Sequence, residues 1–191
     1  AIERYNRAQL AARGGPPPAP GAAFKVLMPV GLPRPPGGDQ PLRNYWTMAT
    51  CAVALAPLAP RARLRGVRAA MDALKAAPTV GVTLKLSAFL GDLLPRSITR
   101  KSVSDIFSRC SLVYSNVPGP QEPLNFAGEE IKGIQCIFPN LLPQVMALSY
   151  NGKIFQNMVV PHDDKFKDSD TFVAFYSDEY EELKKEAFIT T

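Results

Sequence analysis

Prolines limit how long any regular element can be in the first third of this chain. The 191 residues include 19 prolines, and 11 of these lie within the first 60 residues. Each proline removes a backbone donor and fixes one dihedral angle, so it ends a helix or interrupts a central strand. The chain is still long enough to bury one hydrophobic core without a disulfide or a metal. We therefore expect one domain built from short elements.

The hydrophobic pattern between these breaks predicts an α/β (mixed α+β) fold with a mixed sheet flanked by helices. Residues 1–23 are predicted to be a short helix and a proline-rich linker, and residues 24–188 a folded lobe. The apolar pattern of residues 80–94 is compatible with either a strand or a helix, and the length of the segment favours the helix. Strands are predicted at 24–30, 46–55, 111–117, 124–127, 131–138, 145–150 and 153–160, and helices at 61–77, 97–107 and 170–188.

Two local signals give more specific predictions for the C-terminal part of the chain. Asn151-Gly152 lies between two apolar runs, which is the pattern of a two-residue β-hairpin turn. Asp170 is predicted to cap the closing helix. The buried stripe of that helix is predicted to consist of five side chains at helical spacing: Phe172, Phe175, Tyr176, Tyr180 and Leu183.

Charge is unevenly distributed along the sequence. Residues 1–120 carry 16 Lys and Arg against 5 Asp and Glu, whereas residues 121–191 carry 6 Lys against 12 Asp and Glu. The basic part can meet an anionic partner or form a solvated face. Nucleic-acid binding predicts aromatic side chains among the arginines, and residues 61–75 contain none. We therefore expect no nucleic-acid partner.

Cysteine and histidine content narrows the chemistry further. The three cysteines form no C-x-x-C pair, which favours reduced thiols in an intracellular compartment. A single histidine, His162, excludes a multi-histidine metal site, and no G-x-S-x-G motif presents a serine to it. The longest uncharged window, residues 133–152, contains two prolines and several amides, so no transmembrane segment is expected.

Two motifs carry a family resemblance. Residues 115–120 read Ser-Asn-Val-Pro-Gly-Pro, and residues 148–152 read Leu-Ser-Tyr-Asn-Gly. In this order and spacing they resemble the C-terminal half of the wax ester synthase/diacylglycerol acyltransferase family, and the resemblance spans Phe24 to Leu183. Three upstream segments are also similar to that family: Met28-Pro29-Val30, Leu42-Arg43-Asn44-Tyr45 and Met71-Asp72-Ala73-Leu74-Lys75.

The resemblance implies one lobe of a chloramphenicol-acetyltransferase-like fold. It implies acyl transfer from acyl-CoA to a long-chain alcohol or diacylglycerol, in wax ester or triacylglycerol synthesis, without a metal or a cofactor. The family's general base is the second histidine of an H-H-x-x-x-D motif, which this chain lacks. The resemblance therefore implies that the base lies in an N-terminal lobe of the same polypeptide. It also implies that the first helix is a remnant of that half, and that no catalytic residue lies in this chain.

Three polar residues are candidates for lining the substrate site. Asn116, beside Ser115, ends a predicted strand and is braced by the Pro118-Gly119-Pro120 turn, so its amide would point in a fixed direction. Such an amide can orient substrate or an oxyanion, or it can cap the turn through the backbone, and both interpretations stay open. Asn44 is a weaker candidate, because asparagine after a Pro/Gly loop is typical of a turn.

Three arginines are candidates for CoA binding. Arg61, Arg65 and Arg68 recur on the flank of one predicted helix, and guanidinium groups suit bidentate phosphate contacts. The same pattern is also typical of a solvated helix face. The sequence contains no group of residues with metal-ligand spacing, so no metal site is predicted.

The leading hypothesis is therefore an acyltransferase lobe. Its partners would be acyl-CoA, diacylglycerol or a long-chain alcohol, and the N-terminal lobe. The alternative is a non-catalytic acyl-lipid-binding or scaffold module of the same fold. Because both products are insoluble in water, we expect an intracellular protein associated peripherally with the plasma membrane, endoplasmic reticulum or a lipid droplet.

Overall fold

The chain divides into two compact units in the computed structural model. The helical unit comprises Ala1–Phe24, Ala52–Ala76 and His162–Thr191, and the sheet unit comprises Lys25–Cys51 and Ala77–Pro161. The structure describes residues 1–31, 46–56, 58–77, 81, 96–160 and 168–188. The predictions for residues 80–94 and for Asn44 lie outside the described residues, except for Gly81.

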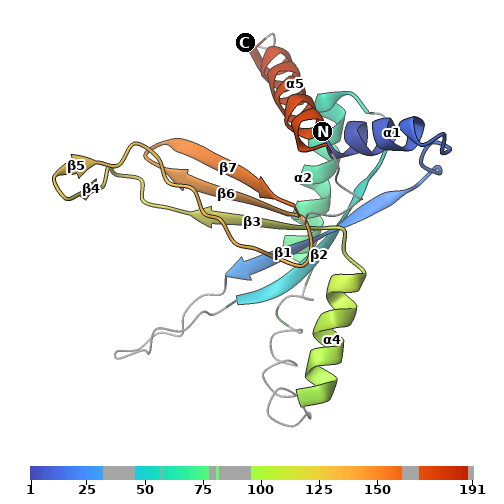
Figure 1. The fold of residues 1–191 in the computed structure, drawn as a ribbon, viewed down its shortest axis with the longest axis horizontal. Coiled ribbons are helices and arrows are strands. Elements are labelled where there is room, and N and C mark those ends of the chain that lie inside the picture. Colours follow the sequence, from blue (N-terminus) through green and yellow to red (C-terminus); the bar gives the residue numbers. More distant parts are fainter. Residues whose placement is uncertain (32–45, 57, 78–80, 82–95, 161–167, 189–191) are drawn as a thin grey trace. The chain divides into compact units, whose positions relative to one another are not determined.

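Helices and strands alternate in mixed order along the described chain (Figure 1). This order confirms the predicted mixed α/β class. The elements are α1 (Ile2–Ala12), β1 (Ala23–Gly31), β2 (Trp46–Ala54), α2 (Pro60–Ala76), α4 (Arg96–Ser108), β3 (Leu112–Pro118), β4 (Asn125–Phe126), β5 (Glu129–Glu130), β6 (Gln144–Tyr150), β7 (Lys153–Val159) and α5 (Ser169–Phe188).

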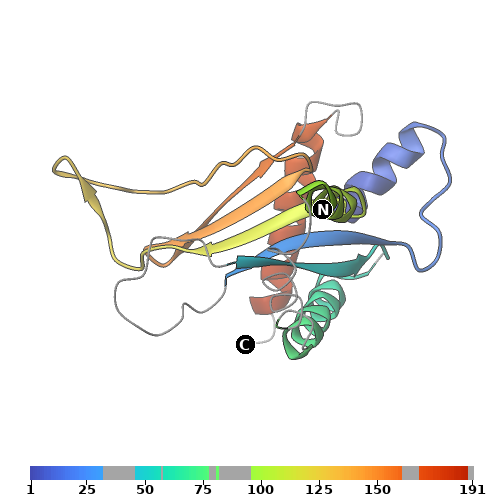
Figure 2. The same ribbon diagram turned by 90° about the horizontal axis from the view of Figure 1, so that it is seen from below.

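The main sheet has five strands in the order β2-β1-β3-β6-β7, and Figure 2 shows them side by side. The pairs β1–β3 and β3–β6 are parallel, and β6–β7 is antiparallel, so the sheet is mixed as predicted. Strands β4 and β5 form a separate two-stranded ribbon. Because β3 and β6 are parallel neighbours, their carboxyl ends meet at one edge of the sheet.

The core of the sheet unit lies where β1 and β3 pair. Val26, Leu27 and Met28 are consecutive and all buried, which is the pattern of a strand covered on both faces. Leu27 packs with Val113 and Cys110, and Phe107 near the end of α4 packs against this cluster. Helix α4 thus contributes to one face of the sheet.

The β6–β7 hairpin forms at the predicted turn. Asn151 and Gly152 both have positive φ, at 46° and 70°, as a type I′ turn requires. The two-residue turn pairs Tyr150 with Lys153 and fixes the register of the remaining strand residues. The sequence signal therefore determined both the turn and the alignment of two strands.

Three predictions need correction. The strand predicted at 131–138 does not form, because this segment has no ladder partner; the short strand β5 lies before it. Asp168, not Asp170, caps α5 through its bonds to the backbone and the hydroxyl of Thr171. Tyr176 and Tyr180 are exposed, so the buried stripe of α5 is narrower than predicted.

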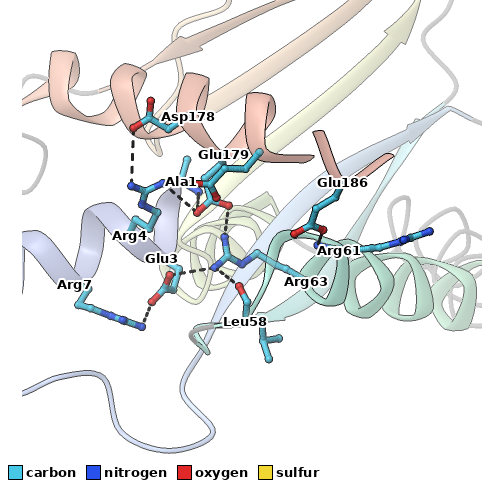
Figure 3. A network of polar contacts seen from close by, with 11 residues as sticks. Ala1, Glu3, Arg4, Arg7, Leu58, Arg61, Arg63, Asp178, Glu179 and Glu186 are labelled. Carbon is cyan, nitrogen blue, oxygen red and sulfur yellow. Dashed lines mark hydrogen bonds and ion pairs between the residues drawn. The ribbon is translucent and has the colours of Figure 1, made fainter. Parts of the chain in front are cut away.

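The helical unit is built around α5, which contacts both α1 and α2. Tyr5 and Phe172 are buried against each other with edge-to-face rings whose centroids are 5.8 Å apart. Among the described residues of this unit, a charged group is also buried. Glu3 is 5% exposed and pairs with Arg63 at 3.3 Å and with Arg7, and Arg63 also reaches Glu179 at 2.6 Å (Figure 3).

Candidate functional site

The two family-like motifs meet in the sheet unit. Strands β3 and β6 pair in parallel so that Pro118 lies opposite Ser149, near the carboxyl end of both strands. The Ser149 hydroxyl accepts hydrogen bonds from the Gly119 amide at 3.2 Å and from the Gln121 side chain at 3.3 Å. The Asn151 amide donates to the Pro120 carbonyl at 3.0 Å. The two turns are therefore bonded to each other directly.

Gly119 allows this close approach. A Cβ atom at this position would lie 2.2 Å from the Ser149 carbonyl oxygen and 3.1 Å from Leu148 Cδ2. The first distance is far inside any real contact, so a side chain would push the two strand ends apart. Glycine at the centre of Pro118-Gly119-Pro120 is thus explained by packing rather than by a positive φ.

Tyr150 fixes the next segment of the chain. Its side chain is only 1% exposed, and its hydroxyl accepts from the Leu124 amide at 2.8 Å and donates to the Ile131 carbonyl at 2.7 Å. The Ile131 amide donates in turn to the Leu124 carbonyl. One buried hydroxyl thus holds both sides of the loop that carries β4 and β5.

Asn116 lies on β3, two residues before Pro118. Its side chain is exposed, and no hydrogen bond joins it to another residue in the described part of the chain. The alternative role as a turn cap would need such a bond to the backbone. An amide held on a strand and open to solvent can donate to one ligand oxygen and accept from a ligand hydroxyl.

Gln156 is a residue that the sequence analysis missed. Asn116 pairs with Ala147 on β6, and Ala147 pairs with Gln156 on β7, so all three side chains lie on one face of the sheet. The short side chain of Ala147 lies between the two amides in this row. The hairpin turn predicts that Gln156 lies opposite Ala147, but only the β3–β6 pairing brings Asn116 beside them.

Ser115 lies on the opposite face. It is 8% exposed and shares its face with Val113, which packs in the core near α4. Asn116 and Ser115 are adjacent in sequence and therefore do not share a surface. Of the three predicted lining residues, the structure exposes Asn116, buries Ser115 and does not describe Asn44.

The three candidate arginines lie on α2 in the helical unit, whereas Asn116 belongs to the sheet unit. Arg65 and Arg68 are exposed, and Arg68 forms an i,i+4 pair with Asp72 at 3.7 Å. The backbone amide of Arg61 donates to Glu186 at 3.1 Å. Exposure of this stripe suits an anionic ligand as well as a solvated face.

The described residues give little support for a thiol nucleophile, a metal site or a membrane-spanning helix. Burial raises the pKa of the Cys110 thiol, an effect that the nearby Lys25 only partly opposes, so this thiol is a poor nucleophile. Within the described residues, no three His, Cys, Asp or Glu side chains cluster as metal ligands would. None of the described helices combines the length and the apolar character that a membrane span needs.

Both motifs lie within a segment of the chain that matches a known family. The family model for the WS/DGAT C-terminal domain matches residues 43–184, which is most of the chain and includes both motifs. The chain belongs to this family. Its predicted membership is therefore confirmed. No curated protein matched the sequence.

A solved structure shows the fold of this WS/DGAT domain. The wax ester synthase/diacylglycerol acyltransferase from Marinobacter aquaeolei VT8 superposes with a TM-score of 0.59 at 17% sequence identity. The match covers 97% of this chain but 41% of that protein, so the chain spans less than half of its solved relative. The likeness confirms a chloramphenicol-acetyltransferase-like lobe with a mixed sheet.

Proposed function

We propose that this chain is the C-terminal lobe of an acyl-CoA-dependent O-acyltransferase that makes wax esters or triacylglycerol. Family membership and the likeness to a wax ester synthase support this proposal. The observation that carries it is the bonding of the Ser-Asn-Val-Pro-Gly-Pro turn to the Leu-Ser-Tyr-Asn-Gly turn, together with the exposure of Asn116 on β3, which is paired with β6. Acyl transfer develops negative charge on the carbonyl oxygen, and a polar group held in a fixed direction can stabilise that charge.

The reaction requires a base, and the base lies outside this chain in the proposal. A histidine of the N-terminal lobe removes the proton from the acceptor hydroxyl, and the oxygen attacks the thioester carbonyl. The tetrahedral oxyanion then collapses to the ester and expels the CoA thiolate. The Asn116 amide donates a hydrogen bond to the oxyanion or to the acyl carbonyl, and Gln156 extends this polar row.

The finer substrate contacts belong to the same proposal. Arg61, Arg65 and Arg68 bind the phosphates of CoA, and the acceptor is diacylglycerol or a long-chain alcohol. The enzyme works inside the cell at a membrane or a lipid droplet, where its acceptor is dissolved. If CoA binding to the full-length protein is not weakened by salt or by Arg65→Gln with Arg68→Gln, the arginines form only a solvated face.

The deciding experiment is Asn116→Ala in the full-length polypeptide, assayed with labelled acyl-CoA. Loss of an oxyanion donor is expected to lower kcat by about 100-fold or more, with an unchanged melting temperature. Val117→Ala is the matched control, because Val117 is the next exposed residue of β3 and points to the other face. Unchanged acyl transfer in Asn116→Ala would show that Asn116 has no role in the substrate site.

A second measurement tests where the base lies. The chain alone is expected to transfer no acyl group, and activity is expected when the N-terminal lobe is present. Esterification by this chain alone would contradict the proposal. A full-length protein that binds acyl-CoA without transferring it would favour the alternative, a non-catalytic lipid-binding module.

A further inference from the structure

The segment between β3 and β6 is unusually long for a connection within a domain. Residues 121–143, called the arm, include only the two-residue strands β4 and β5. Loops longer than about 12–15 residues without structure of their own are uncommon and usually functional. Figure 1 shows the arm reaching beyond the end of β3 and returning alongside β6 and β7.

The arm displays large apolar side chains along its length. Phe126, Ile137, Phe138 and Leu141 are 76%, 69%, 59% and 84% exposed. One exposed apolar residue on a surface needs no explanation, but four on one segment mark an interaction surface. Aromatic side chains of this kind dominate the binding energy of interfaces.

The arm is held in place by the sheet rather than free. The Tyr150 hydroxyl ties both sides of the β4–β5 loop, and the Asn157 side chain donates to the Cys136 carbonyl at 2.7 Å. Gly133 lies under the Phe155 ring, where a Cβ atom would be 2.6 Å from the ring. A surface that is already ordered loses little entropy on binding, so the exposed side chains are presented ready for a partner.

Charge on the arm disfavours an anionic lipid surface as the partner. The arm carries Glu122, Glu129 and Glu130 against Lys132, and Lys132 already pairs with Glu130 at 2.9 Å. Anionic membranes attract basic segments and repel acidic ones. Apolar anchors with a polar, acidic margin match the pattern of a protein–protein interface.

We propose that the arm is the docking surface for the N-terminal lobe of the same polypeptide, with Phe126, Phe138 and Leu141 as its anchors. The existence of that lobe rests on the proposed function, and the length of the solved relative supports it, because this chain corresponds to 41% of that protein. The arm then joins the two lobes and holds the lobe carrying the base against the sheet edge with the two motifs.

Hydrogen exchange in the full-length protein tests the proposal without using activity. The amides of residues 124–141 are expected to exchange slowly, and Phe126→Ser with Phe138→Ser is expected to speed their exchange by roughly tenfold or more, the effect of losing aromatic burial. Val173→Ser is the matched control, because Val173 on α5 is 58% exposed, nearly the same as Phe138. Fast exchange of the arm in the unmodified protein would overturn the proposal.

Photocrosslinking identifies the occupant even where a variant folds poorly. A benzophenone side chain at position 126 is expected to crosslink to residues upstream of this chain within one polypeptide. Crosslinks to a second copy, or to lipid when vesicles are added, would overturn the assignment. A protein that transfers no acyl group but whose arm crosslinks to the upstream residues would refute the proposed function and still support the docking surface.

Discussion

The helical unit and the sheet unit bury different chemistry. The helical unit buries the aromatic contact between Tyr5 and Phe172 and also a carboxylate, Glu3, which pairs with two arginines. In the sheet unit, the cluster around Leu27 is apolar, and the strand ladders and the Tyr150 hydroxyl supply hydrogen bonds. The first unit therefore depends on charge pairing and the second on packing and backbone bonds.

This difference predicts different responses to mutation and salt. Buried apolar groups lose their transfer free energy when truncated, and salt changes this little. Charge pairs at partly exposed positions weaken as salt rises. Four substitutions, made in the full-length polypeptide and followed by urea unfolding unless stated otherwise, test the comparison from the largest expected effect to the smallest.

The largest effect is expected for Leu27→Ala in the sheet unit. Leu27 is fully buried, so truncation leaves a cavity and is expected to lower the free energy of unfolding by about 4 kcal/mol. The loss should be nearly the same at low and high salt. Leu64→Ala, at an exposed position of α2, is the control and should change stability by less than about 0.5 kcal/mol. Equal losses for the two variants would contradict the location of the core.

Arg63→Met is expected to be next in size. It removes one partner of Glu3 and one of Glu179 but keeps an apolar stem of similar length. We expect a loss of about 2 kcal/mol, because the buried Glu3 then keeps only Arg7 as a charged partner. The cost should shrink at high salt. Arg65→Met on the same helix is the control, because Arg65 is exposed. If both variants unfold at the same urea concentration, the charge network does not stabilise the helical unit.

Tyr150→Phe separates hydrogen bonding from packing in the sheet unit. The ring stays, but the Leu124 amide and the Ile131 carbonyl lose their partner, so we expect a loss of about 1–2 kcal/mol. Hydrogen exchange at Leu124 should accelerate. The control is Tyr114→Phe on β3, where no hydroxyl bond to another described residue is found. An unchanged exchange rate at Leu124 would show that Tyr150 does not anchor the arm.

The smallest effect is expected at the cap of α5. Hydrogen bonds from the Thr171 hydroxyl and amide lower the pKa of Asp168 below its ordinary value of 3.8. A lowered pKa means that the charged form stabilises the fold above the ordinary value, and this contribution disappears as the pH falls through the folded-state pKa. Asp168→Asn should therefore be less stable than the unmodified protein at neutral pH and nearly equal to it in acid.

The control for the cap is Asp170→Asn. This change removes the same charge from the first turn of α5 but leaves the Thr171 bonds in place. Its stability should show a weaker dependence on pH in the acid range. A cap at Asp170, as the sequence alone predicted, would reverse the order of the two variants.

Local signals in the sequence predicted much of the fold. Strands β1, β2 and β3 lie close to their predicted positions, α2 ends just before Pro78, and Asn151-Gly152 set the β6–β7 register. The bounds of these elements follow from local features, namely apolar runs, proline breaks and turn residues. The prediction at 131–138 failed because an apolar run forms a strand only when a partner strand is available, and here Tyr150 and Asn157 hold it instead.

The candidate site was predictable only in part. The motif around Asn116 drew attention to the right turn, but the alternation of side chains placed Ser115 in the core and Asn116 on the surface. Gln156 carried no motif of its own. Its position beside Asn116 follows from two strand pairings, one of which joins residues about thirty apart in sequence.

The sequence by itself determined the short elements, the hairpin and the family, because proline breaks, turn residues and motif order act over a few residues. Only the tertiary structure decided that Gly119 must be glycine, that Arg63 joins a charge network around the buried Glu3, and that the arm exposes its apolar side chains. Each of these depends on which distant segments come within a few ångströms of one another. Residue pattern alone does not specify such distances.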